Sequence, residues 1–389
     1  MPSDIVAERP FVCNISVGRV SIQAFHGRQR TGESAVAAKS KSKLEKVNIG
    51  VIGVGGIGRV HLGGYEKCPE AKVVAVCDLI EDRTQWAADK YGIDKTFKDY
   101  KEMLQLPEID AVSICVPNYL HAEMAIAAFE AGKHVLCEKP LCINPKDGEA
   151  MVAASQKANK KFMTAFNNRF RGDTQTLKKF IEGGELGEIY FGKTGWIRRK
   201  GIPGMGSWFT QKAKAGGGPL IDIGVHVLDL ALWLMGNPKA VSVTGSTYSV
   251  FGCKGEGMGD WGTSEAGGIC DVEDLAAGFI KLDTGATLML EASWASHIEK
   301  DLIFTSLIGT KGGADVDPFR IYKDMHGSIV DITPGFRNQS GHDMEIRHFI
   351  DCLIQNKTPI STGEHGLEVV RILNAIYKSA ATGKEVRLK

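Results

Sequence analysis

A glycine-rich turn between two short apolar runs constrains this chain more than any other feature. The first run, residues 49–54, ends in Gly53-Val54-Gly55-Gly56-Ile57-Gly58, which fits G-x-G-x-x-G where a buried strand turns into a helix. The second run, residues 73–77, leads into Asp78, at the distance of about 20 residues expected for the carboxylate that binds a ribose 2′-OH. Glycines let the backbone approach a pyrophosphate, and the free N–H groups of the helix start bind it. The pattern therefore predicts dinucleotide binding rather than a merely structural turn.

The predicted dinucleotide site collects residues from the carboxyl ends of several strands, because ligands of open parallel sheets bind outside those ends. Asp78 favours NAD over NADP, since a carboxylate would repel the extra 2′-phosphate; Arg83 nearby is the one contrary sign. The residues that we expect to contact NAD are Gly53, Gly55, Gly56, Ile57, Gly58, Asp78, Pro117, Asn118, His121 and Glu138.

The composition limits the classes of function that the chain can have. It has 389 residues, a formal net charge of +1 and 43% hydrophobic residues, which predicts a globular protein of two domains without nucleic-acid or membrane partners. No apolar run approaches the ~20 residues of a bilayer span. The nine cysteines form no C-x-x-C pair, so we expect reduced thiols, no metal site and a cytoplasmic location.

The periodicity changes twice along the chain. Residues 1–46 are polar and basic and predict a disordered tail, with a transit peptide as the alternative. Residues 47–168 alternate apolar strands with helices, for example at 81–91 and 145–158, which predicts a Rossmann domain with a parallel sheet. Residues 169–389 are rich in successive strands with tight turns, which predicts an α/β domain with an antiparallel or mixed sheet. Helices at about 220–235, 343–355 and 366–381 can cover this second sheet.

Glu138-Lys139-Pro140 ends the strand predicted at residues 134–137. Pro140 biases Lys139 toward extended backbone, so its side chain is held at the strand end, over the place where a nicotinamide should lie. An ammonium group there can hydrogen-bond a substrate hydroxyl and stabilise alkoxide character as hydride departs. A lysine at an ordinary strand exit explains the same residues equally well.

A second candidate constellation lies in the apolar helix predicted at residues 220–235. Asp222 and His226 are four residues apart, hence on one helical face. Burying a carboxylate with an imidazole costs free energy unless they pair or bind a ligand. His226 would take a proton from a substrate hydroxyl and Asp222 would orient it or bind a neighbouring hydroxyl. A satisfied core histidine beside a capping aspartate, or a zinc site, are the alternatives.

Residues between the two constellations are candidates for substrate contact. Residues 196–209 combine tryptophans with basic neighbours and glycines, which suits a sugar face or an anionic substituent; a solvated basic turn is the alternative. The glycine-rich loop at 251–268 is either a lid or a subunit contact. The residues that we expect to contact substrate are Asn167, Arg169, Arg198 and Trp208.

Together, these motifs resemble the Gfo/Idh/MocA oxidoreductase family from about residue 47 to 388. The resemblance rests on the glycine motif with Asp78, on Glu138-Lys139-Pro140, and on Gly217-Gly218 followed by Asp222-x-Gly224-x-His226. It implies a large, mostly antiparallel open sheet in the C-terminal domain, used for homodimers or homotetramers, and it implies that Lys139 and His226 flank the reacting carbinol with Asp222 beside them. Histidine at position 226 looks more like inositol dehydrogenase than like glucose-fructose oxidoreductase.

The expected activity is therefore reversible, NAD-dependent oxidation of a secondary hydroxyl on a cyclitol, sugar or sugar derivative. Two other functions are known among proteins that resemble this family. One is a glycosidase that oxidises its sugar transiently and returns the hydride. The other is a non-catalytic, dinucleotide-responsive regulator, which has no need of Lys139, Asp222 and His226 together.

Overall fold

The computed structural model describes residues 45–264 and 268–388, so the tail predicted for 1–46 lies almost entirely outside the described residues. Its first sheet is parallel, with six strands in the order β3-β2-β1-β4-β5-β6. This order confirms the predicted Rossmann fold. The strands are β1 (Val47–Ile52), β2 (Ala71–Cys77), β3 (Lys95–Phe97), β4 (Ala111–Ile114), β5 (His134–Glu138) and β6 (Phe162–Ala165).

Helices cover both faces of this sheet, as the alternating pattern predicts. The predicted helices at 81–91 and 145–158 are confirmed residue for residue, and the first ends at Gly92 with a left-handed φ of 64°. The helices of this region are α1 (Gly56–Glu66), α2 (Glu81–Tyr91), α3 (Tyr100–Leu104), α4 (His121–Glu130) and α5 (Pro145–Ala158), with a 3-10 turn, η1 (Asn118–Leu120).

The second sheet has nine strands in the order β14-β13-β12-β11-β7-β10-β9-β8-β15. All its pairings are antiparallel except that of β7 with β10, which confirms a large, mostly antiparallel open sheet. The strands are β7 (Ile189–Ile197), β8 (Ala240–Tyr248), β9 (Leu275–Leu282), β10 (Thr287–Ser293), β11 (Leu302–Gly309), β12 (Gly313–Asp315), β13 (Arg320–Met325), β14 (Ser328–Ile332) and β15 (Val386–Arg387).

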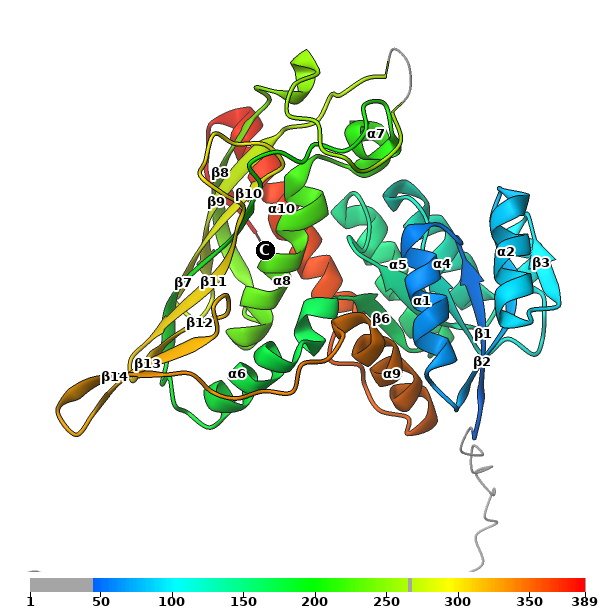
Figure 1. The fold of residues 1–389 in the computed structure, drawn as a ribbon, viewed down its shortest axis with the longest axis horizontal. Coiled ribbons are helices and arrows are strands. Elements are labelled where there is room, and N and C mark those ends of the chain that lie inside the picture. Colours follow the sequence, from blue (N-terminus) through cyan, green and yellow to red (C-terminus); the bar gives the residue numbers. More distant parts are fainter. Residues whose placement is uncertain (1–44, 265–267, 389) are drawn as a thin grey trace, which may run out of the picture. The chain divides into compact units, whose positions relative to one another are not determined.

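Helices pack on one face of the second sheet and leave the other face open (Figure 1). The elements of this region are η2 (Asn167–Phe170), α6 (Gly172–Glu182), η3 (Trp208–Thr210), α7 (Lys212–Ala215), η4 (Leu220–Gly224), α8 (Val225–Leu234), η5 (Gly252–Lys254), α9 (Gly341–Ile354) and α10 (Gly363–Thr382). The stretch Lys212–Leu234 is long and apolar enough to cross a membrane, contrary to the expectation from sequence, but 89% of its most apolar window is buried in the protein.

The predicted cover of the second sheet is wrong for one helix. α9 packs against α1 and the first sheet, because its apolar side chains, among them Ile346 and Phe349, join the core around Val47 and Leu62. Gly64 of α1 permits this approach: a Cβ there would lie 2.3 Å from the Ile346 side chain. The chain thus returns to the Rossmann sheet at α9, which brings the start of this helix toward the predicted site.

Candidate active site

The glycine turn after β1 meets two different demands. Gly53 has a left-handed φ of 91°, and a Cβ there would lie 2.3 Å from the Cys115 carbonyl oxygen; a Cβ on Gly58 would lie 2.0 Å from the Gly53 carbonyl oxygen. The protein's own packing therefore requires these two glycines. A Cβ on Gly55 would meet nothing nearer than Arg83 at 3.8 Å, and one on Gly56 would meet nothing within 4 Å.

The open space at Gly55 and Gly56 fits a bound pyrophosphate. α1 begins at Gly56, and no side chain caps its first N–H groups, so these donors point into the space that the missing side chains leave. The carboxylate that follows the second strand of the motif, Asp78, also lies beside the glycine turn. Asp78 accepts hydrogen bonds from the backbone N–H of Val54 at 2.8 Å and of Ile80 at 2.9 Å, which fixes its carboxylate beside the turn. Arg83 lies 3.6 Å from it.

The other predicted cofactor residues lie at the ends of β4 and β5, but not all of them face a cavity. Pro117 precedes η1, and Asn118 donates a hydrogen bond to the Ala215 carbonyl oxygen of α7 at 2.8 Å. His121 is fully buried, with both ring nitrogens 2.8 Å from the carbonyl oxygens of Pro140 and Val116. The prediction that His121 contacts the dinucleotide is therefore wrong, because the ring is used to hold the backbone behind the cavity wall.

Glu138 belongs to a buried polar network beneath the site. One carboxylate oxygen lies 3.0 Å from Nε2 of His61, whose Nδ1 lies 3.1 Å from the Ser113 hydroxyl. The other accepts the Lys139 backbone N–H at 3.1 Å. Burial alone would raise the pKa of Glu138, but the His61 hydrogen bond and the Lys139 charge hold that pKa below its usual range. The network fixes the backbone from which the Lys139 side chain projects.

Lys139 and Asp222 meet across the two parts of the chain. The Lys139 ammonium donates to the Asp222 backbone carbonyl at 3.0 Å and to its carboxylate at 3.3 Å. The other carboxylate oxygen accepts Nε1–H of Trp294 at 3.1 Å, and Trp294 is fully buried. Asp222 is thus held from two sides, and the ammonium keeps donor capacity for a further oxygen.

His226 is the group that can accept a proton. Asp222 and His226 are the partly exposed positions of an otherwise buried helical stretch, which confirms that they share a face. Among the described residues no group hydrogen-bonds to the His226 ring, which packs on Trp196 with centroids 6.0 Å apart. Burial, with the nearby charges of Lys139 and Arg198, holds the pKa of His226 well below its usual range. The ring is therefore neutral near pH 7, as a general base must be.

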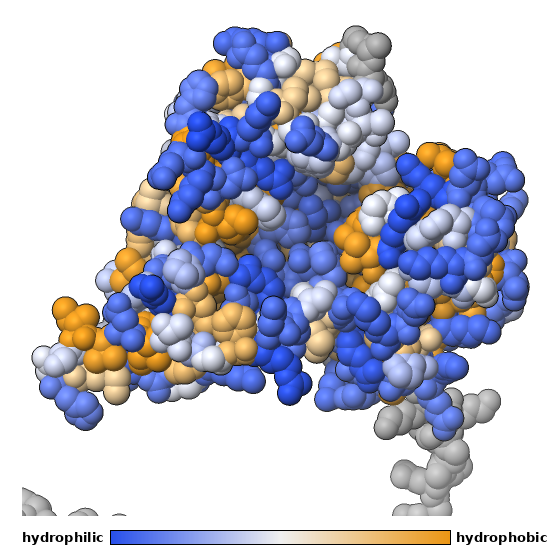
Figure 2. Space-filling view, viewed as in Figure 1, coloured by the Kyte–Doolittle hydropathy of each residue, from blue (hydrophilic) through white to orange (hydrophobic). Residues whose placement is uncertain are grey.

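Two cavities meet at His226. The first, called the inner cavity, has a volume of about 330 Å³, and the second, called the outer cavity, about 370 Å³. Figure 2 shows a hydrophilic hollow on this face, between the regions of α8 and α1. The inner cavity is lined by Ile57, Val116, Asn118, Glu138, Lys139, Pro140, Asn167, Asn168, Trp196, Trp208, Phe209, Asp222, His226 and His342. The outer cavity is lined by Trp196, Arg198, Lys200, Gly201, Asp222, Ile223, His226, Gly259, Asp260, Trp261 and Asp301.

The structure brings three of the four predicted substrate residues to these cavities. Asn167 and Trp208 line the inner cavity and Arg198 the outer one. Oδ1 of Asn167 is buried and has no hydrogen-bond partner within the described residues, so it is free for a ligand donor.

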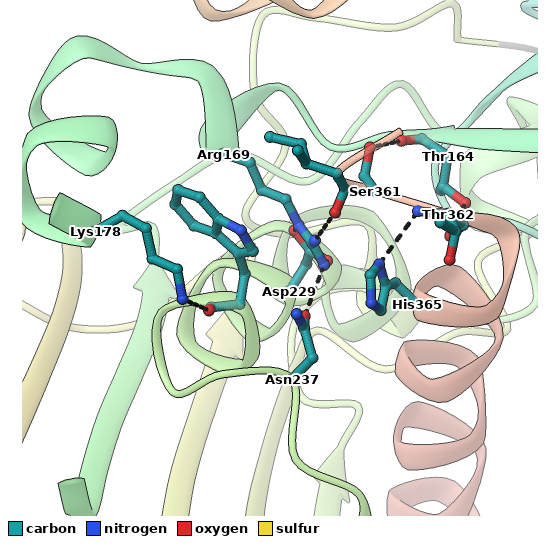
Figure 3. Close-up of polar contacts among 10 residues, drawn as sticks. Thr164, Arg169, Lys178, Asp229, Asn237, Ser361, Thr362 and His365 are labelled. Carbon is teal, nitrogen blue, oxygen red and sulfur yellow. Dashed lines mark hydrogen bonds and ion pairs between the residues drawn. The ribbon is translucent and has the colours of Figure 1, made fainter. Parts of the chain in front are cut away.

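The prediction for Arg169 is wrong. Its side chain is 1% exposed and forms a two-pronged ion pair with Asp229, at 2.9 and 2.6 Å, while a third N–H donates to the Ile360 carbonyl oxygen at 2.6 Å (Figure 3). These bonds occupy the guanidinium N–H groups that would otherwise donate to a substrate. Arg169 joins η2, α8 and the segment before α10.

Sequence reasoning missed His342, the second residue of α9. It lines the inner cavity, and its buried Nδ1 has no hydrogen-bond partner in the described part of the chain but lies 3.9 Å from a carboxylate oxygen of Glu345. The Ser340 side chain caps this helix by accepting the Asp343 N–H, which is a readable start signal. This signal predicts where the helix starts but not which elements it packs against. His342 reaches the site only because α9 packs on α1.

The described residues contain no group of three or more His, Cys, Asp or Glu side chains that could hold a metal ion. The Lys139 ammonium, the neutral His226 imidazole and the fixed Asp222 carboxylate line the inner cavity. The glycine turn borders the same cavity through Ile57. Such a set can bind a hydroxyl group, remove its proton and stabilise charge on its oxygen without a metal.

Comparisons with known proteins agree with this architecture. Residues 47–166 match the model of the oxidoreductase family with an NAD-binding Rossmann fold, and residues 174–315 match the GFO/IDH/MocA C-terminal domain. D-glucoside 3-dehydrogenase of Escherichia coli is 35% identical over 353 residues, covering 90% of this chain and 100% of that protein. The NAD-dependent scyllo-inositol 2-dehydrogenase of Bacillus subtilis is 31% identical, covering 88% and 96%.

A solved structure of levoglucosan dehydrogenase in complex with NADH and levoglucosan superposes with a TM-score of 0.78 at 26% identity, covering 88% of this chain and 99% of that one. The two family models together span more than half of the sequence, in the order of the two sheets. The chain therefore belongs to the Gfo/Idh/MocA oxidoreductase family.

Proposed function

We propose that the protein is an NAD-dependent dehydrogenase that reversibly oxidises a secondary hydroxyl of a sugar, cyclitol or sugar derivative. The observation that carries this proposal is the convergence of Lys139, Asp222 and His226 on an inner cavity that also borders the glycine turn. Residues 47–168 would form the NAD-binding domain and residues 169–389 the substrate and oligomerisation domain. The names of the relatives, which include glucoside, levoglucosan and inositol dehydrogenases, support the same class of reaction.

Each member of the trio has a distinct role in this reaction. The neutral His226 ring accepts the hydroxyl proton of the substrate, and the Lys139 ammonium donates a hydrogen bond to the same oxygen as negative charge develops on it. Asp222 holds the ammonium in place and is itself held by Trp294. Bound NAD⁺ would supply the hydride acceptor for the carbinol carbon, so that the net reaction converts alcohol and NAD⁺ into ketone, NADH and a proton. Gly55, Gly56 and Asp78 would hold this cofactor.

The test is reduced-nicotinamide absorbance when purified protein and NAD⁺ are incubated with inositols, aldoses, sugar acids and glycosides, with aglycone release measured alongside. Growth of NADH with one stereochemical group is the expected result. Aglycone release without net NADH would instead assign the same residues to a redox-cycling glycosidase. Tight NAD binding with neither product, over the whole panel, would contradict the proposal in favour of a dinucleotide-responsive regulator.

We further propose that the protein is a cytoplasmic homodimer or homotetramer that associates through the open face of the second sheet. Large apolar side chains stand exposed on this face, including Phe279 (41% exposed), Leu302 (41%) and Ile308 (40%). Such a row on one sheet face supports association with another copy. The eight cysteines among the described residues are free thiols, which supports a reducing compartment.

A further inference from the structure

The outer cavity offers room beyond the place where the reaction would occur. Every residue that lines it comes from position 196 or later, so nothing from the Rossmann sheet contributes to it. It shares only Trp196, Asp222 and His226 with the inner cavity. A substrate hydroxyl at His226 therefore leaves about 370 Å³ for the rest of the molecule. At ~30 Å³ per water this is the volume of about 12 waters, enough for one more sugar ring.

Flat side chains are fixed in the wall of this cavity. The guanidinium carbon of Arg198 lies 5.2 Å from the ring centroid of Trp196 and 5.5 Å from that of Trp261. Nε1–H of Trp261 donates to the Gly201 carbonyl oxygen at 2.9 Å, which sets the plane of its indole. The guanidinium of Arg198 has no carboxylate or carbonyl partner among the residues that the structure describes, so its N–H groups are available to a ligand.

The loop that carries Trp261 belongs to the cavity of its own subunit. Gly259 donates its N–H to the Ile202 carbonyl oxygen at 2.7 Å, and Gly204 donates to the Trp261 carbonyl oxygen at 2.8 Å. The described part of the loop is thus tied to the segment that follows β7 and forms a wall of the site. The sequence left two roles open for this loop, a lid or a subunit contact, and these bonds favour a lid over the substrate.

The charges around the outer cavity balance. Asp222 is paired with Lys139, which leaves Arg198 and Lys200 opposite Asp260 and Asp301. A site for a phosphate or a carboxylate would carry an excess of positive charge. Two cations with two carboxylates suit a neutral group whose hydroxyls both donate and accept hydrogen bonds. Indole faces in addition suit the apolar faces of a sugar ring.

We propose that the outer cavity binds a second, uncharged sugar ring, so that the preferred substrates are neutral glycosides of disaccharide size rather than free monosaccharides. This proposal rests on the proposed dehydrogenase function. The ring that is oxidised lies in the inner cavity between Lys139 and His226. Its glycosidic partner packs against Trp261, and hydroxyls of that partner bind Arg198 and Asp260.

The first experiment compares kcat/KM for NADH formation with glucose, its two methyl glycosides, and the neutral disaccharides maltose, cellobiose, lactose and trehalose. We expect the best disaccharide to exceed its methyl glycoside at least ~10-fold, because remote binding energy raises kcat/KM.

Arg198→Met and Trp261→Ala should each bring this ratio close to one. Arg199→Met is the matched control, since Arg199 is adjacent in sequence but outside the cavity. A wild-type ratio near one, or a preference for glucose 6-phosphate, would overturn the proposal.

A second experiment separates failure of the subsite from failure of the dehydrogenase assignment. Cellobiose and methyl β-glucoside are titrated into the full chain without NAD⁺, and tryptophan fluorescence is followed in the wild type and in Arg198→Met, whose thermal unfolding is checked first. Tighter binding of cellobiose, weakened ~10-fold or more by Arg198→Met, supports the subsite even if no sugar is oxidised. Equal binding of the two sugars overturns the subsite even if both are oxidised.

Discussion

Lys139, just after β5, and His226, on α8, line the same inner cavity, and each is expected to act on the substrate rather than on the cofactor. His226→Ala or Lys139→Ala should lower kcat by ~100-fold or more, since general-base and electrostatic contributions are each of that order. The dissociation constant for NADH, measured by fluorescence, should stay near the wild-type value. Equal loss of NADH binding would show that these residues hold the cofactor instead.

The lowered pKa of His226 predicts the pH dependence of the reaction. The base acts only when neutral, so activity is lost as pH falls through the folded-state pKa, which burial and the nearby cations hold well below the usual value. The profile of kcat/KM for alcohol oxidation should therefore show no acid limb at the ordinary histidine pKa of about 6.5. A limb at that pH, lost in His226→Ala, would show that the ring is solvated in the working enzyme.

Glu345 imposes a pH dependence on stability. Both its carboxylate oxygens are buried without a hydrogen-bond partner among the described residues, and burial, with Glu138 and Asp229 nearby, raises the pKa of Glu345 well above its usual range. The folded protein therefore retains a proton that the unfolded chain releases above about pH 4.5, so stability falls as pH rises toward the folded pKa.

Glu345→Gln removes this pH dependence because the amide has no proton to lose. Its Tm should match the wild type near pH 4.5 and exceed it by a few °C at pH 8, on the scale of roughly 2–4 °C per kcal/mol. Glu66→Gln, on the exposed surface of α1, is the control and should give no pH-dependent difference. A constant difference in Tm across this range would instead indicate that Glu345 stays ionised.

At the scale of elements, the Arg169 and Asp229 pair joins η2 to α8 and to the segment before α10. Asp229→Ala should lower the free energy of unfolding by about 3–5 kcal/mol in urea titrations, because it leaves a buried guanidinium without its counter-charge. The double variant Arg169→Met with Asp229→Leu should recover much of that loss. Lys98→Ala, which breaks an exposed pair with Glu81, serves as the surface comparison. An Asp229→Ala variant as stable as wild type would show that water reaches Arg169.

The elements that could be predicted from the sequence are those whose first or last residues carry a clear start or stop signal. α2 and α5 were predictable because Gly92 and Asn144 mark a helix end and a helix start, and the glycine turn was predictable because only glycine fits at Gly53 and Gly58. β12 to β14 and α6 were not predicted, because their short or polar segments lack a sustained period. The start of the helix at residues 220–235 also differs, since η4 is a π-helical turn that continues into α8.

Contacts between distant segments set the limit of prediction at the site. Lys139, Asp222 and His226 could be predicted from local patterns. Lys139 lies in a Glu-Lys-Pro strand end, and the other two are polar residues in an apolar helix. Arg169 carried no sign that its partner lies 60 residues away, and His342 none that α9 would pack on α1. Such pairings follow from how the whole chain packs, which one sequence does not report.

At the scale of the whole molecule, the open face of the second sheet predicts self-association. Ile308→Lys with Phe279→Glu should shift the mass measured by light scattering from a dimer or tetramer toward the monomer, because each places a charge among the exposed apolar side chains of the open face. Lys281→Glu, also on β9 but polar in the wild type, is the control. A wild-type protein that is monomeric at micromolar concentration would contradict the proposal directly.

The outer cavity draws all its walls from the part of the chain that follows residue 195, whereas the glycine turn and Asp78 precede residue 80. The residues that would bind the second sugar ring and those that would select the coenzyme are therefore encoded by separate stretches of the gene. Random mutagenesis confined to codons 196–201 and 259–261 should change which glycosides the enzyme oxidises while the coenzyme requirement stays the same. The fold in this way allows one coenzyme module to serve enzymes that diversify by changing a single wall.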